Sequence, residues 1–155
     1  MKSIPKIDSG GQTGADRAAL DWALERGVPC GGWCPKGRKA EDGPIDPKYP
    51  LKETPSASYI QRTEWNVRDS DATILFSVEP TFSGGSKRTM EFARKHKKRR
   101  LHLYPGVSEA ADKLRVFVQE NSVKVLNVAG PRASTEAKVG QFLMALLDEV
   151  LGMPD

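Results

Sequence analysis

The chain of 155 residues has few of the residue types that build zinc sites, disulfides or membrane spans. Its two cysteines, Cys30 and Cys34, and its two histidines, His96 and His102, do not follow a zinc-ligand spacing. We therefore expect reduced thiols and predict no metal site. The apolar run FLMALL near the carboxyl end is far shorter than the roughly 20 residues of a bilayer span, and the amino terminus lacks a secretory pattern. These features predict a cytoplasmic protein without membrane contact.

Several motifs of catalysis and nucleotide binding are also missing. The sequence contains neither the P-loop GxxxxGK[ST] nor the dinucleotide motif GxGxxG. A Ser-His-Asp triad is not expected either, because His96 lies in a basic helix end and His102 within a predicted strand. The best acid or base candidates are Glu91 and then Asp16, each in the first turn of a predicted helix. A carboxylate there also stabilises the helix dipole, so no catalytic group is assigned.

Positive charge exceeds negative charge, with a net charge of +4. This excess favours anionic ligands without requiring nucleic acid. Part of it lies at residues 94–100, RKHKKRR, at the end of a predicted helix, where the dipole favours cations. Aromatic residues that could stack on bases are not interleaved with these cations. A solvated helix end is therefore favoured over a nucleic-acid interface.

Apolar periodicity predicts that strands and helices alternate along the chain. The expected strands are residues 4–8, 28–33, 72–78, 100–104 and 123–130. The expected helices are residues 13–26, 58–69, a segment ending near 98, 108–121 and 135–151. This order predicts one domain over residues 1–155, an α/β three-layer sandwich with a mainly parallel, Rossmann-like sheet. Residues 34–56 form a long polar stretch, either a flap over a ligand or a solvated loop.

Three turns rich in small or polar residues follow predicted strands: DSGGQTGAD, PTFSGGSKRT and VAGPRAST. Because parallel strands end at one edge of a sheet, we expect the three turns to converge there. Each precedes a predicted helix, whose unpaired amides and positive dipole end would favour an anion. The sequence therefore predicts a pocket for a ligand with a phosphate or another oxyanion.

The candidate binding groups are backbone amides, hydroxyls and cations of these turns and of the long polar stretch. They belong to Ser9, Gly10, Gly11, Gln12, Thr13, Lys36, Arg38, Ser83, Gly84, Gly85, Ser86, Thr89, Gly130 and Arg132. Ser9 and Ser83 could instead only cap helices. Arg62, Asn66 and Asp69 form a polar stripe on a neighbouring helix, which could face this pocket or water.

Six blocks of the sequence together resemble the molybdenum carrier protein family. They are SGGQTGADRAALDWA, GGWCPKGRKAEDGPI, YPLKET, RTEWNVRDSDATILF, SGGSKRTMEFA and LNVAGPRAS. The family is part of a Rossmann-like superfamily with the Lonely-Guy, lysine-decarboxylase-like proteins. The resemblance implies a homo-oligomeric carrier that binds molybdenum cofactor, a pterin with a phosphate tail and a dithiolene-held molybdenum, at the three turns. It also implies molybdoenzymes or cofactor-biosynthesis proteins as partners.

A nucleotide-processing enzyme like the phosphoribohydrolases is the alternative, with Glu91 as its acid or base. Those relatives carry GGxGTxxE, whereas this chain has SGGSKRTME, in which Thr89 and Glu91 stand at a shifted spacing. The shift favours a carrier over a hydrolase. Nucleic-acid binding through residues 94–100 is a third hypothesis.

Overall fold

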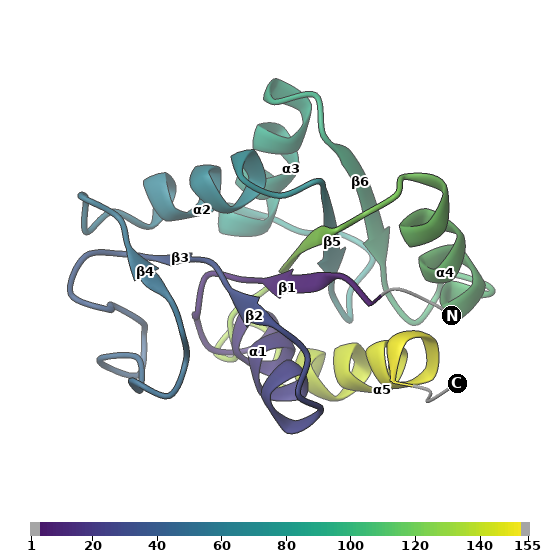
Figure 1. The fold of residues 1–155 in the computed structure, drawn as a ribbon, viewed down its shortest axis with the longest axis horizontal. Coiled ribbons are helices and arrows are strands. Elements are labelled where there is room, and N and C mark those ends of the chain that lie inside the picture. Colours follow the sequence, from purple (N-terminus) through teal and green to yellow (C-terminus); the bar gives the residue numbers. More distant parts are fainter. Residues whose placement is uncertain (1–3, 153–155) are drawn as a thin grey trace.

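The computed structural model describes residues 4–152 and has three layers, with a five-stranded sheet between two groups of helices (Figure 1). Every strand pair in this sheet is parallel, in the order β2-β1-β7-β5-β6. The strands are β1 (Lys6–Asp8), β2 (Cys30–Gly31), β5 (Ala72–Phe76), β6 (Arg99–Leu103) and β7 (Val125–Ala129). The predicted α/β sandwich with a parallel sheet is confirmed.

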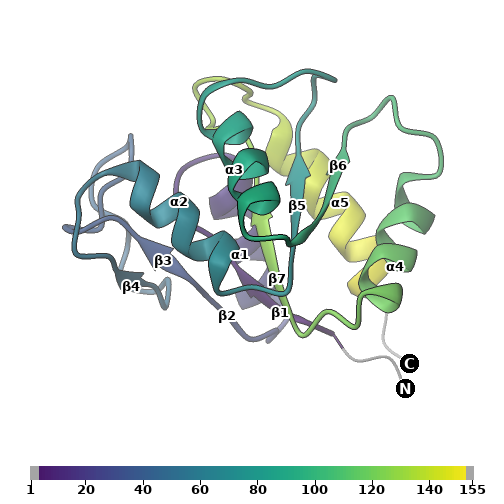
Figure 2. The same ribbon diagram turned by 90° about the horizontal axis from the view of Figure 1, so that it is seen from above.

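Five helices cover the two faces of the sheet (Figures 1 and 2). They are α1 (Ala15–Glu25), α2 (Tyr59–Arg68), α3 (Gly84–Lys95), α4 (Ala110–Glu120) and α5 (Val139–Leu151). Helices α1, α4 and α5 pack together on one face, and α2 packs on α3 on the other. Strand β5 is buried throughout its length because helices cover both of its faces. No helix in the described part of the chain is long and apolar enough to cross a membrane.

The contact between α1 and α5 depends on small side chains. Ala18, Ala19 and Ala23 of α1 are buried, and a Cβ atom added to Gly140 of α5 would lie 3.2 Å from the Cβ of Ala18. The two helices therefore approach closely. Since the turns after β1 and β7 lead into these helices, their packing also holds the two turns side by side.

The predicted strand 28–33 is wrong in its extent, because it divides at Gly32. Residues on either side join different sheets: β2 belongs to the large sheet, and β3 (Trp33–Cys34) pairs with β4 (Lys52–Glu53) in a separate two-stranded sheet. Gly32 has a φ of +121°, and a Cβ atom there would lie 2.4 Å from the carbonyl oxygen of Ser9. The close approach of the first turn therefore requires glycine at the break.

The long polar stretch between β3 and β4 is folded rather than solvated. Its side chains form a small hydrophobic cluster with α1, made of Leu20, Cys34, Ala40, Ile45 and Tyr49. The Arg38 guanidinium lies inside the stretch and donates hydrogen bonds of 2.8–3.4 Å to the carbonyl oxygens of Ile45, Asp46, Tyr49 and Leu51. One side chain thus satisfies four backbone acceptors, which fixes the path of residues 38–51.

Candidate functional site

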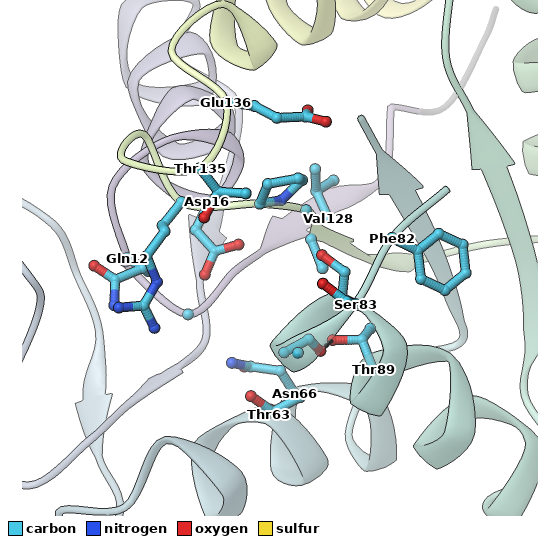
Figure 3. Close-up of a pocket in the computed structure, with 18 of the residues that line it drawn as sticks. Gln12, Asp16, Thr63, Asn66, Phe82, Ser83, Thr89, Val128, Thr135 and Glu136 are labelled. Atoms are coloured by element: carbon cyan, nitrogen blue, oxygen red, sulfur yellow. Dashed lines mark hydrogen bonds between the residues drawn. The ribbon is translucent and has the colours of Figure 1, made fainter. Parts of the chain in front are cut away.

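A cavity of about 480 Å³ opens at the carboxyl edge of the sheet, where β1, β5 and β7 end (Figure 3). All three predicted turns contribute to its wall, together with α2. Nine of the candidate binding residues line it: Gly10, Gln12, Ser83, Gly84, Gly85, Ser86, Thr89, Gly130 and Arg132. The structure therefore brings together turns that lie far apart in the sequence.

The amino terminus of α3 lies at the cavity with its first amides unpaired. The N–H groups of Gly84, Gly85 and Ser86 have no hydrogen-bond partner within residues 4–152. Ser83 occupies the N-cap position in an extended conformation, and its side chain makes no capping hydrogen bond. Together with the positive end of the helix dipole, these amides form a site that favours an anion.

The other two helices do not offer the same open terminus. The Ala15 amide, the first of α1, donates to the carbonyl oxygen of Pro131 at 3.1 Å. Helix α5 begins at Val139, well beyond the third turn, because residues 135–138 remain outside the helix. The prediction that each turn leads directly into an open helix terminus is therefore wrong for α1 and α5.

A buried acid and a buried base, Asp16 and Arg62, lie in the same wall. Arg62 Nη1 donates to the Gly10 carbonyl oxygen at 2.7 Å and lies 3.9 Å from Asp16 Oδ2. Burial raises the pKa of Asp16 to about 6, against the opposing effects of Arg62, the Gln12 backbone amide, Arg17 and Arg132. Burial likewise lowers the pKa of Arg62. The cavity thus contains a carboxyl group whose charge changes near neutral pH.

The side-chain amide of Gln12 is only partly satisfied. Its Oε1 accepts from the backbone amides of Thr13 at 3.0 Å and Glu41 at 2.9 Å, which fixes the orientation of the group. Its Nε2 is buried and has no hydrogen-bond partner among the described residues. A buried unpaired donor costs about 1–3 kcal/mol and is uncommon in native proteins. Gln12 itself lines the cavity.

Two glutamates hold the turns in place from outside the sheet. The Glu41 carboxylate accepts from Thr13 Oγ1 and from the amide and hydroxyl of Ser134, and these hydrogen bonds lower the pKa of Glu41. Glu136 accepts from the amides of Val78 at 2.7 Å and Glu79 at 3.1 Å. Sequence reasoning missed both glutamates, because their partners lie far away along the chain.

Comparison with known proteins gives the family. The model of the circularly permuted YpsA SLOG family matches residues 7–151. The chain belongs to this family. A crystal structure of a protein from Syntrophus aciditrophicus SB, named "putative molybdenum carrier protein", superimposes with a TM-score of 0.92. The two sequences are 46% identical over 96% of this chain and 95% of the other. A search of curated proteins finds no match.

Five of the candidate binding residues lie outside the cavity wall of this family member. Ser9 is buried and its Oγ donates to the Asp16 carbonyl oxygen at 3.0 Å. Gly11 packs against the folded stretch between β3 and β4, and Thr13 donates to Glu41. Arg38 binds the backbone within that stretch, and Lys36 is exposed. Four of the five thus have structural contacts that account for them, whereas Lys36 contributes only a backbone hydrogen bond, from its amide to the Ser56 carbonyl oxygen at 3.1 Å.

The polar stripe on α2 divides between the cavity and the protein. Arg62 and Asn66 line the cavity, and both Asn66 amide atoms also bind the backbone of Trp33, at 2.8 and 2.9 Å. Asp69 instead accepts from Trp33 Nε1 and Arg68. Of the two orientations that the sequence allows for this stripe, toward the pocket or toward water, Arg62 and Asn66 therefore take the first.

The remaining reactive residues lie elsewhere. Glu91 is exposed on α3 and does not line the cavity. Cys30 and Cys34 are free, and burial raises the pKa of both thiols, which disfavours the reactive thiolate. Among the described residues, no three His, Cys, Asp or Glu side chains gather to hold a metal ion.

Proposed function

We propose that this protein binds and carries molybdenum cofactor, or a closely related phosphorylated ligand, in the cavity at the carboxyl edge of its sheet. The observation that carries the proposal is that the three α3 amides and Gln12, whose buried Nε2 also has no partner among the described residues, belong to the wall of one cavity. The volume of about 480 Å³ is typical of small-molecule sites. The Syntrophus aciditrophicus relative is named a molybdenum carrier protein, and this name supports a molybdenum-containing ligand.

The donor set suits such a cargo. Phosphate and oxo groups accept hydrogen bonds. The backbone amides of Gly84, Gly85 and Ser86 would donate these bonds, so no charged side chain has to be buried against the ligand. Arg132 lines the cavity and adds positive charge at its wall. Glu91, on which the enzyme alternative depended, is absent from the wall, and this favours a carrier. Homo-oligomerisation and delivery to molybdoenzymes or cofactor-biosynthesis proteins stay predictions.

Calorimetric titration with molybdenum cofactor under anaerobic conditions tests this function. We expect one cofactor per chain with a micromolar or tighter Kd. Ser83→Asp would place a carboxylate at the open end of α3 and should weaken binding at least tenfold. Ser58→Asp is the matched control, because Ser58 is likewise an N-cap serine, on α2, and lies outside the cavity.

Failure of the cofactor to bind at tens of micromolar, with tight binding of a nucleotide instead, would overturn the proposal. Incubation with nucleoside monophosphates provides a second check. Release of free base that Asp16→Asn abolishes would identify an enzyme rather than a carrier.

A further inference from the structure

The cavity that we assign to an anion also contains an acid. Asp16 is 8% exposed and lines the wall, where Figure 3 shows its carboxyl group on the same side as Gln12 and opposite Ser83 and Thr89. The charged groups around Asp16 are Arg62 at 3.9 Å and, farther away, Arg17 and Arg132. A ligand anion must therefore share this space with the Asp16 carboxylate.

Two further acids, Glu79 and Glu136, line the cavity. The Glu136 carboxylate is already occupied by the amides of Val78 and Glu79, and the Glu79 side chain is exposed at the rim. Of the three acids that line the cavity, Asp16 is therefore the buried one whose carboxyl group is not already bound by two backbone amides. An ionised carboxylate only accepts hydrogen bonds, and so does a fully ionised oxyanion. The two would repel each other in a buried cavity, unless a proton lies between them.

We propose that Asp16 makes the cavity selective for oxyanions that carry an ionisable proton, such as hydrogen phosphate or a singly ionised phosphate monoester, by accepting a hydrogen bond from the ligand's own hydroxyl group. This inference rests on the proposed function, and it names the residue that selects the phosphate group. A fully ionised oxyanion such as sulfate lacks the proton, so it binds only when Asp16 itself takes one from solvent.

The surroundings of Asp16 supply the complementary group. Gln12 Nε2 is a buried donor without a partner among the described residues, and Gln12 lies on the same side of the cavity as the acceptor Asp16 (Figure 3). A hydroxyl-bearing oxyanion offers both an acceptor oxygen for Gln12 and a donor for Asp16. Sites built around such a pair reject analogues that lack the hydroxyl, because the buried acceptor is then left unpaired. A phosphate monoester keeps this proton only below its second pKa, near 6, whereas inorganic phosphate has one proton more and still carries a hydroxyl group where the monoester has lost it.

Proton linkage gives the inference a second signature. The pKa of Asp16 is about 6, so sulfate binding should require the uptake of one proton at higher pH. The sulfate affinity should then fall about tenfold for each pH unit between pH 6.5 and 8. Inorganic phosphate brings its own proton, so its affinity should fall much less than that of sulfate over the lower part of this pH range.

Calorimetric or competition titrations with inorganic phosphate and sulfate, in buffers free of both ions, test the proposal. Wild-type protein should bind phosphate at least tenfold tighter than sulfate at pH 7.5. Asp16→Asn should bring the two affinities within about threefold and remove the pH dependence of sulfate binding. Asp148→Asn removes the same charge from an exposed pair with Arg26, far from the cavity, and should keep the preference.

Equal affinity of the wild-type protein for the two ions, or a sulfate affinity that does not change with pH, would overturn the inference. The wild-type pH series alone decides this if Asp16→Asn does not fold. Binding of molybdenum cofactor together with equal phosphate and sulfate affinities would leave the carrier function standing and remove only the role of Asp16.

Discussion

The tripeptide Ser-Gly-Gly occurs twice at the carboxyl edge of the sheet, at residues 9–11 and 83–85, and the two copies have different surroundings. A Cβ atom on Gly10 would lie 2.6 Å from the Arg62 side chain, and one on Gly11 would lie 2.6 Å from Leu51. Cβ atoms on Gly84 and Gly85 would meet no atom within 4 Å. The first copy is packed against the protein, and the second faces open space.

This difference separates two reasons for glycine at a turn. At residues 10 and 11 the backbone must pass close to other parts of the same chain, so protein packing explains the glycines. At residue 85 no packing contact and no positive φ requires glycine, although Gly84 has a φ of +55°. Close approach of a ligand to the α3 amides would explain the second copy.

Gly11→Ala and Gly84→Ala test the comparison most strongly. Both positions have positive φ, +80° and +55°, so both substitutions should cost about 1–2 kcal/mol in backbone strain. Only Gly11→Ala also crowds Leu51 and Ile45, which should bring its total loss to about 3 kcal/mol or more. Denaturant unfolding of both variants measures this. Equal losses would show that packing does not distinguish the two turns.

Arg38→Lys should destabilise residues 38–51, the segment whose side chains pack against Gly11 of the first copy. An ammonium group cannot reach the four carbonyl oxygens that the Arg38 guanidinium binds, and we expect a loss of about 2 kcal/mol with faster trypsin cleavage after Lys39 and Lys48. Phosphate affinity should stay the same, because Arg38 lies outside the cavity wall. Lys36→Arg, at an exposed position, is the control and should change neither property.

The buried Asp16 carboxyl group in the cavity wall predicts an unusual pH dependence of stability. The folded-state pKa of Asp16, about 6, lies above the ordinary aspartate value of 3.8, so folding favours the protonated form. The stabilisation is complete below pH 4 and is lost as pH rises through 6. Unfolding free energy should therefore fall by about 1–2 kcal/mol between pH 5 and 8.

Comparison with Asp16→Asn isolates this contribution. His102 acts in the opposite direction, since burial lowers its pKa, but its effect is common to both proteins. The difference between wild type and Asp16→Asn should thus slope with pH across 5–8. A constant difference would mean that Asp16 titrates at its ordinary pKa.

The sequence predicted the sheet and the convergence of the turns, because both follow from periodicity and from the geometry of parallel strands. It did not predict which glycines are packed against the protein and which are open. Ser9 and Ser83 both precede Gly-Gly, and contacts with Ile45, Leu51 and Arg62, distant along the chain, make the two turns different. The roles of Glu41 and Glu136 were hidden for the same reason. Long-range side-chain contacts leave no local pattern.

Gly85→Ala should change stability least and binding most clearly. The position lies in the first turn of α3 with no atom near its Cβ, so alanine should leave the unfolding free energy unchanged or raise it by less than about 1 kcal/mol. The added methyl group would occupy the space in front of the α3 amides, and phosphate affinity should fall about tenfold. Calorimetric titration with phosphate is run beside Gly27→Ala, at an open glycine outside the cavity. Gly27 has a φ of +66°, so this control should lose about 1–2 kcal/mol of stability and keep its phosphate affinity. Unchanged phosphate affinity in Gly85→Ala would mean that the open turn does not hold the anion, and the contrast between the two Ser-Gly-Gly copies would then reflect packing alone.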